Sequence, residues 1–355
     1  MGTSTKPNVQ FTYDAVGRRT RIDYPASTNS QVAFDDFVKT TTDQRGKQLR
    51  YTNDAYGRLT KVEEFNSGST HTTTYEYDVF NNLKKTTDNV GNETTVTYDS
   101  LSRKTAMADP DMGSWSYVYD KNDNLTSQTD AKSQTISFTY DALNRVTLKD
   151  LPTPETDVTY AYDSAPSGYS GQTGYWVGRL AKVTDASGTH EFLYDKQGSV
   201  LKDKKTVDST AYEFVRTYDS MGRVRTLTYP DTEVVTYTYN GFGDVETISG
   251  LKNSVTTDYI KDVNYNPSGQ ITFTKYGNNV TSDYTYNTNT LRLSNILTKK
   301  PDGTTKLQDL SYTFDNNGNV TRISDIVNSN TQDFTYDDLN RLTQAVGSAY
   351  GAQNF

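Results

Sequence analysis

The chain has 355 residues, of which only 33% are hydrophobic and 28 are tyrosine, and its formal net charge is -8. The acidic balance and the scattered basic residues disfavour a nucleic-acid partner, because phosphate binding depends on clustered lysine and arginine. The absence of cysteine excludes disulfides, thiol catalysis and cysteine-ligated metal sites. No apolar run reaches the roughly 18 residues of a membrane span.

A repeat runs through almost the whole sequence. An aromatic residue followed by Asp or Asn recurs at intervals of about 21 residues, with insertions between some copies, and in one of the fourteen copies Asn53 stands in place of the aromatic residue. We expect a lead-in at residues 1–10, without the features of a signal peptide, a repeat array at 11–346 and a tail at 347–355. The Asp or Asn members are Asp14, Asp54, Asp78, Asp99, Asp120, Asp141, Asp163, Asp195, Asp219, Asn240, Asn266, Asn287, Asp315 and Asp337.

Each copy predicts a β-hairpin. Before the Asp, apolar residues occupy every second position, as in Ile136, Phe138 and Tyr140, which is typical of a strand with one buried face. Three residues after the Asp or Asn, ten of the fourteen copies have Gly or Asn. That spacing indicates a type I turn closed by a residue with positive φ and a G1 bulge.

The return strand leaves one question open. Its apolar residues lie three apart, as at Val245 and Ile248, which strict alternation would place on opposite faces. Either the strand contains a bulge or both faces of the sheet are partly covered. We expect an all-β protein, in which tandem hairpins form one antiparallel sheet that coils into a spiral shell or wide barrel-like solenoid. A β-propeller is the rival fold, although the spacing lacks a regular double-length period.

The best copies share Tyr-Asp-x-x-[Gly/Asn]-Arg, and this motif resembles the signature of the Rhs/YD-repeat family. That family includes bacterial Rhs proteins, the BC component of Tc toxins and the teneurins. The motif residues are Tyr13, Asp14, Gly17 and Arg18; Tyr140, Asp141, Asn144 and Arg145; Tyr218, Asp219, Gly222 and Arg223; and Tyr336, Asp337, Asn340 and Arg341.

The resemblance implies a function that composition alone does not. In the family, such repeats wind into a hollow shell, and in the toxins the shell encloses a C-terminal effector. We therefore expect a structural scaffold that is not an enzyme and is secreted or displayed at a bacterial cell surface. Its expected partner is the remainder of a larger Rhs-type polypeptide or its effector cargo. End-to-end pairing of exposed sheet edges, which would give a filament subunit, is the other expected association.

The sequence predicts no catalytic, metal or cofactor site. His71 and His190 lack the spacing of a triad or a metal pair, so we expect structural, solvent-exposed roles. The Asp- and Asn-rich stretches at 120–124 and 315–319 lack the glycine and glutamate of an EF-hand loop. The Asp109-Pro110 segment fits an ordinary turn, and we assign no autoprotease activity to it.

One insertion, near residues 164–178, predicts a long loop. Loops carry recognition more often than scaffolds do, so its aromatic residues Tyr169, Tyr175 and Trp176 are candidates for a surface contact. The alternative function is accordingly a carbohydrate- or protein-binding module that acts through aromatic loops. We expect the other tyrosines to form the packed face of the sheet.

Overall fold

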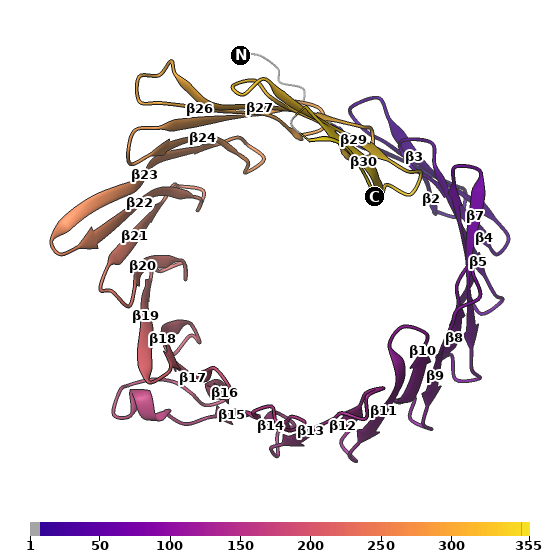
Figure 1. Ribbon diagram of the computed structural model, residues 1–355, viewed down its shortest axis with the longest axis horizontal. Helices are drawn as coiled ribbons and strands as arrows, with labels where there is room; N and C mark the ends of the chain where they lie inside the picture. Colours follow the sequence, from indigo (N-terminus) through magenta and orange to yellow (C-terminus); the bar gives the residue numbers. More distant parts are fainter. Residues whose placement is uncertain (1–7, 349) are drawn as a thin grey trace. The chain divides into compact units, whose positions relative to one another are not determined.

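A computed structural model describes residues 8–348 and 350–355 and contains almost only β-strands, with one short 3-10 helix in the described residues. The chain divides into unit 1, residues 1–93 and 262–355, and unit 2, residues 94–261. Figure 1 shows the strands of each unit following one another as hairpins in chain order. The predicted all-β hairpin fold is therefore confirmed.

Unit 1 contains two runs of strands. The first run consists of β1 (Gln10–Tyr13), β2 (Arg19–Asp23), β3 (Asn29–Asp35), β4 (Val38–Thr42), β5 (Gln48–Asn53), β6 (Leu59–Asn66), β7 (Ser69–Tyr77) and β8 (Leu83–Thr87). The second run consists of β24 (Ile271–Tyr276), β25 (Thr281–Tyr286), β26 (Leu293–Lys299), β27 (Lys306–Phe314), β28 (Val320–Asp325), β29 (Asn330–Tyr336), β30 (Leu342–Gly347) and β31 (Gly351–Asn354).

Unit 2 contains the strands between these runs, and the unit boundaries fall in β9 and β23. The strands are β9 (Glu93–Tyr98), β10 (Lys104–Asp109), β11 (Gly113–Tyr119), β12 (Leu125–Thr129), β13 (Thr135–Tyr140), β14 (Val146–Asp150), β15 (Val158–Tyr162), β16 (Leu180–Asp185), β17 (Gly188–Tyr194), β18 (Val200–Val207), β19 (Thr210–Tyr218), β20 (Val224–Thr228), β21 (Val234–Tyr239), β22 (Val245–Lys252) and β23 (Val255–Tyr265). The 3-10 helix η1 (Ser167–Tyr169) lies in the insertion.

Strand pairing is antiparallel and sequential throughout each unit. In unit 2, pairing continues without a break from β9 to β23. A propeller needs separate blades of four strands, so this continuous ladder argues against the rival fold.

The return strands are bulged, which answers the question left open by the sequence. Tyr239 pairs with Val245 and Tyr237 pairs with Ile248, while Glu246 is the extra residue. Directly paired residues of antiparallel strands share a face, so the bulge places Val245 and Ile248 on the same face as the tyrosines.

The sheet has very little conventional core. Only six hydrophobic residues are buried among the described residues, and most inward positions along the strands are half-buried. Four of the six, including Tyr169 and Trp176, form one cluster next to the insertion. The regular repeats are therefore held mainly by contacts other than a deep apolar interior.

The first strand begins in the expected lead-in, and the last strand lies in the expected tail. Residues 1–7 of the expected lead-in lie outside the described residues, and β1 begins at Gln10, within the expected lead-in. The expected tail contains β31, which pairs with β30. The predicted insertion separates β15 from β16.

Candidate functional site: stapled turns, the insertion and the seam of unit 1

The Asp of each motif organises its own turn. Asp14 Oδ1 accepts hydrogen bonds from the backbone N–H groups of Val16 and Arg18, at 3.0 and 2.8 Å, and Oδ2 accepts one from Arg18 Nε at 2.7 Å. Gly17 has a φ of 82°, a conformation that favours glycine. The Arg18 side-chain hydrogen bond lowers the pKa of Asp14 below its ordinary value. The same Arg Nε contact recurs at Asp54, Asp99, Asp141, Asp219 and Asp337.

The Arg of one motif then reaches the turn of the next. Arg103 Nη1 donates to the Asp120 carbonyl and to Asp123 Oδ1, both at 2.9 Å. Its guanidinium carbon lies 5.0 Å from the ring centroid of Tyr119. Similarly, Arg145 donates to Asp163 Oδ1 at 3.1 Å, and this bond lowers the pKa of Asp163 to about 2.

The motif tyrosine links a hairpin to the preceding one. Tyr140 OH donates to the Leu125 carbonyl at 2.7 Å, across from the previous repeat. We call the Tyr hydroxyl bond and the Asp–Arg–next-turn bonds together the inter-repeat staple. The tyrosine bond recurs in both units, at Tyr77, Tyr162, Tyr194, Tyr218, Tyr239, Tyr286 and Tyr336.

The predicted motif residues all lie at these turns. The four tyrosines end β1, β13, β19 and β29, and each is followed by its Asp. The residues three positions after the Asp have positive φ, and the arginines follow at once. Those positive-φ residues are Gly17, Asn144, Gly222 and Asn340.

The prediction of an exposed aromatic loop is wrong for two of its three residues. Tyr169 is fully buried and Trp176 is 7% exposed, whereas Tyr175 is 48% exposed. The Trp176 indole donates to the Phe192 carbonyl at 2.7 Å and packs with Ala181 and Leu193. The large aromatic side chains bury apolar area against β16 and β17, which stabilises the loop against the sheet rather than presenting it to a partner. Tyr175 remains a candidate contact.

A buried carboxylate anchors the same loop. Glu191 on β17 is 3% exposed. Its Oε1 accepts hydrogen bonds from Ser167 Oγ and the Gly168 N–H, both at 3.1 Å, and Oε2 lies 3.1 Å from Lys204 Nζ. Sequence reasoning missed Glu191, because no local pattern pairs a strand glutamate with a loop some 23 residues away. The aromatic residues of the loop were the only feature of the sequence that pointed to this site.

Unit 1 contains a seam between turns that are far apart in the sequence. Arg45, in the turn between β4 and β5, donates to Asn340 Oδ1 and to the Asp337 carbonyl, both at 3.0 Å. Lys47 Nζ of the same turn lies 2.8 Å from Asp338 Oδ1 and lowers the pKa of that carboxyl. The β4–β5 turn and the β29–β30 turn, which belong to the two runs of unit 1, are therefore joined by the same types of group that join successive repeats.

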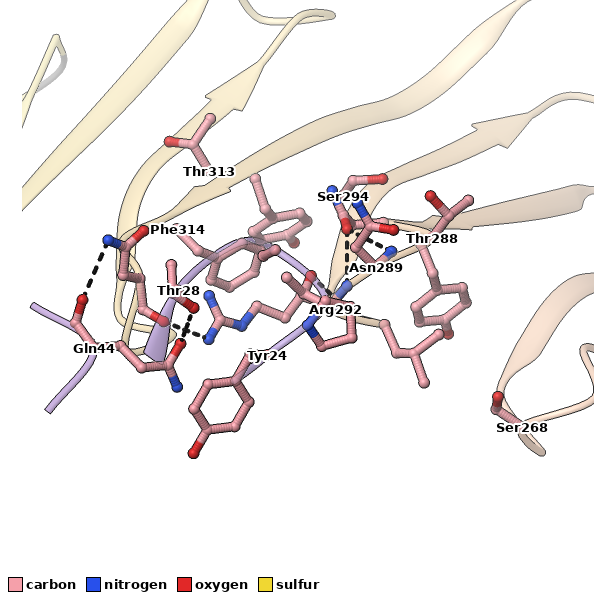
Figure 2. Close-up of a pocket in the computed structure, with 18 of the residues that line it drawn as sticks. Tyr24, Thr28, Gln44, Ser268, Thr288, Asn289, Arg292, Ser294, Thr313 and Phe314 are labelled. Carbon is pink, nitrogen blue, oxygen red and sulfur yellow. Dashed lines mark hydrogen bonds between the residues drawn. The ribbon is translucent and has the colours of Figure 1, made fainter. Parts of the chain in front are cut away.

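A cavity of about 1140 Å³ opens beside this seam and is shown in Figure 2. Arg292 extends across its wall toward Thr28 and Gln44, and its Nη1 donates to the Asp315 carbonyl at 2.7 Å. Thr28 Oγ1 donates to Gln44 Oε1 at 2.7 Å. The wall thus combines residues of the first and second runs of unit 1.

The cavity does not assemble a reactive set of groups. Its lining includes one carboxylate, Asp315, whose oxygens accept hydrogen bonds from Gly318 and Asn319. His71 and His190 are both half-buried and do not line it. In residues 8–348 and 350–355, no group of three or more His, Asp or Glu side chains is arranged to hold a metal ion.

No helix within the described part of the chain is long and apolar enough to cross a membrane.

Part of the chain matches a known repeat family. The family described as RHS Repeat matches residues 77–111 and 119–152. Toxin subunit YenC1 of Yersinia entomophaga is 31% identical over 156 residues, which is 39% of this chain and 15% of that protein.

Two solved structures share the fold of almost the whole chain. The crystal structure of TcdB2-TccC3 aligns with 96% of this chain and 20% of that chain, at a TM-score of 0.85 and 18% identity. The Photorhabdus luminescens Tc holotoxin pore aligns with 96% of this chain and 19% of that one, at a TM-score of 0.84 and 18% identity. The chain thus spans about a fifth or less of these relatives. Its repeats, its relative and its fold together support an Rhs/YD-repeat family protein.

Proposed function

We propose that the chain is a structural scaffold, a segment of an Rhs/YD-repeat β-shell that encloses another polypeptide and has no catalytic activity of its own. The observation that carries this proposal is the inter-repeat staple. It joins hairpin to hairpin through half-exposed turns and needs almost no buried core. A sheet stabilised in this way can grow by adding hairpins, which suits a wall better than a compact catalytic domain.

The proposed partner is the rest of a larger toxin polypeptide, including its effector cargo. The similarity to a subunit named as a toxin supports this partner. We place the assembled protein outside the bacterial cell, either secreted or at the surface.

Protease protection tests enclosure directly. A disordered reporter segment with several protease sites would be joined after Phe355, and its cleavage would be compared with that of the same segment joined to an unrelated β-protein. Enclosure predicts slower cleavage on this chain, and faster cleavage once Arg103→Ala and Arg145→Ala have weakened the staple. Equal cleavage on both carriers would overturn enclosure and favour a scaffold that displays its cargo.

End-to-end association of the sheet is a second proposal, and the terminal strands favour it. β1 and β31 are exposed along their whole lengths. Within the described residues of unit 1, each pairs with one neighbour, β2 or β30. Exposed strand edges readily pair with other strands. Particle mass that rises with concentration in sedimentation measurements would support this association, and a constant monomer mass would exclude it.

A further inference from the structure

Two pairs of neighbouring YD turns are near duplicates in sequence. In unit 1, residues 315–319 read Asp-Asn-Asn-Gly-Asn and residues 337–341 read Asp-Asp-Leu-Asn-Arg. In unit 2, residues 120–124 read Asp-Lys-Asn-Asp-Asn and residues 141–145 read Asp-Ala-Leu-Asn-Arg. We call the first set the covered turn pair and the second the open turn pair.

Both pairs depart from the staple in the same way. In several motifs an Arg reaches the next turn, as Arg58 does when its Nη1 donates to Asn81 Oδ1 at 3.0 Å. Here the Arg is replaced by Asn, which contacts only the amide oxygen of the next turn. Asn319 Nδ2 donates to Asn340 Oδ1 at 2.8 Å, and Asn124 Nδ2 donates to Asn144 Oδ1 at 2.9 Å. Because the Asn side chain is shorter than that of Arg, the position that the guanidinium occupies in other motifs is open to another group.

In the covered turn pair, a distant arginine takes that place. Arg45 donates to Asn340 Oδ1 and to the Asp337 carbonyl, and its Nη1 lies 3.5 Å from Asp315 Oδ2. It belongs to an Asp-Gln-Arg-Gly turn between β4 and β5, almost 300 residues away. A guanidinium from a different hairpin thus completes the staple that Asn319 does not make.

The open turn pair presents the same three acceptors. The equivalents of the atoms bound by Arg45 are Asn144 Oδ1, the Asp141 carbonyl and Asp120 Oδ2. Asp120 Oδ2 is held by Asn124 Nδ2 at 2.9 Å, as Asp315 Oδ2 is held by Asn319 Nδ2 at 2.8 Å. No arginine in residues 8–348 or 350–355 donates to the Asp141 carbonyl or to Asn144 Oδ1.

Exposure distinguishes the two pairs. Leu143 is 69% exposed, whereas its counterpart Leu339 is half-buried and lines a cavity of about 350 Å³ together with Ile22 and Val32. Asn122 is exposed, but its counterpart in the covered pair is half-buried. An apolar side chain at the tip of a polar turn is a surface that a partner would bury with a favourable change in free energy.

We propose that the open turn pair binds an arginine-bearing hairpin turn of the type Asp-x-Arg-Gly from another polypeptide. Its guanidinium would donate to Asn144 Oδ1 and the Asp141 carbonyl beside the Asp120 carboxylate, and Leu143 would pack against the base of the incoming hairpin. The positive charge of the nearby Arg103 does not prevent this binding, because Arg292 occupies the equivalent position beside Arg45 in the covered turn pair.

One substitution predicts a difference between the two sites. Asp338, which pairs with Lys47, is replaced by Ala142 in the open pair. A Lys at the end of the incoming turn is therefore not required, and the Arg is the main determinant of binding. The inference concerns the edge of the sheet and does not depend on whether the shell encloses a cargo.

The test uses a cyclised hairpin peptide with the sequence of residues 38–52, added to the full chain and followed by fluorescence anisotropy. The intramolecular turn already fills the covered pair at a high effective concentration, so the peptide reports on the open pair. We expect binding that weakens at least about tenfold when the peptide carries Arg45→Ala, because charge-assisted hydrogen bonds are lost.

Matched glycine variants identify the site. Asn144→Gly keeps the positive φ of the turn but removes the acceptor, so it should weaken peptide binding by a similar factor. Asn81→Gly changes an equivalent turn whose acceptor is already bound by Arg58, and it should leave peptide binding unchanged. Binding that survives Asn144→Gly, or no binding at millimolar peptide, would overturn the proposal. Self-association lost in Asn144→Gly without peptide binding would instead assign the surface to a second copy.

Discussion

The insertion of unit 2 and the regular repeats are attached to the sheet by different interactions. The insertion buries Tyr169 and Trp176 against Ala181 and Leu193 and therefore has a small apolar core. The repeats rely on hydrogen bonds and ion pairs at turns, where the apolar side chains are exposed. Among those side chains, Phe242 is 95% exposed.

The two kinds of attachment have different requirements. A staple uses only residues of two adjacent repeats, so it can be repeated along a sheet of any length. The cluster at the insertion needs groups from a loop and from β16 and β17, and it occurs once among the described residues. We therefore expect damage to the core to have a larger local effect than damage to any one staple.

Trp176→Ala should have the largest effect. It removes a buried indole and its bond to the Phe192 carbonyl, which should cost about 3 to 5 kcal/mol of local stability. Hydrogen exchange of residues 163–194 measures the loss. Trp115→Ala is the matched control, because Trp115 is half-buried in a regular strand. An equal effect of the two substitutions on their own segments would contradict the distinction between core and staple.

Glu191→Gln should rank second. The substitution keeps the shape but removes the charge that faces Lys204, so we expect a loss of about 1 to 3 kcal/mol in the stability of the loop. Glu76→Gln changes an exposed ion pair and should cost less than about 1 kcal/mol. Exchange rates of the Gly168 amide, which donates to Glu191, are the most direct measurement. Unchanged rates would show that the buried charge does not anchor the loop.

The repeats and the insertion also differ in how far the sequence predicts them. The hairpin turns follow from local chemistry, because an Asp at the start and a positive-φ residue at the third position after it define the turn. The bulge after Val245 was only one of two alternatives, since apolar spacing alone does not reveal register. The burial of Trp176 and the contact of Arg45 with Asn340 depend on residues distant in sequence, and no local pattern encodes them.

Tyr140→Phe isolates a single staple bond. The change removes the hydroxyl that donates to the Leu125 carbonyl and should cost about 1 kcal/mol at the interface between those two repeats. Tyr160→Phe is the control, because the Tyr160 hydroxyl makes no hydrogen bond to another described residue. Amide exchange in β12 and β13 should rise for Tyr140→Phe only. Equal exchange in both variants would mean that the tyrosine acts through packing and not through its hydroxyl.

Acid should weaken the staples. The Arg18 side chain lowers the pKa of Asp14, the Arg145 backbone N–H lowers that of Asp141, and Arg145 lowers that of Asp163 to about 2. A carboxyl whose pKa is lowered in the folded state contributes stability at pH values above its unfolded-state pKa of about 3.9. This contribution is lost as the pH falls through the folded-state pKa.

The melting temperature should consequently be constant above about pH 5 and fall between about pH 4 and pH 2. Exchange protection at the YD turns should fall over the same pH range, and so should that of the Gly168 amide, because hydrogen bonds also lower the pKa of Glu191, which anchors the insertion. A melting temperature that stays flat to about pH 2 would mean that these carboxylates contribute no more in the folded chain than in the unfolded one, since a net contribution requires the two pKa values to differ.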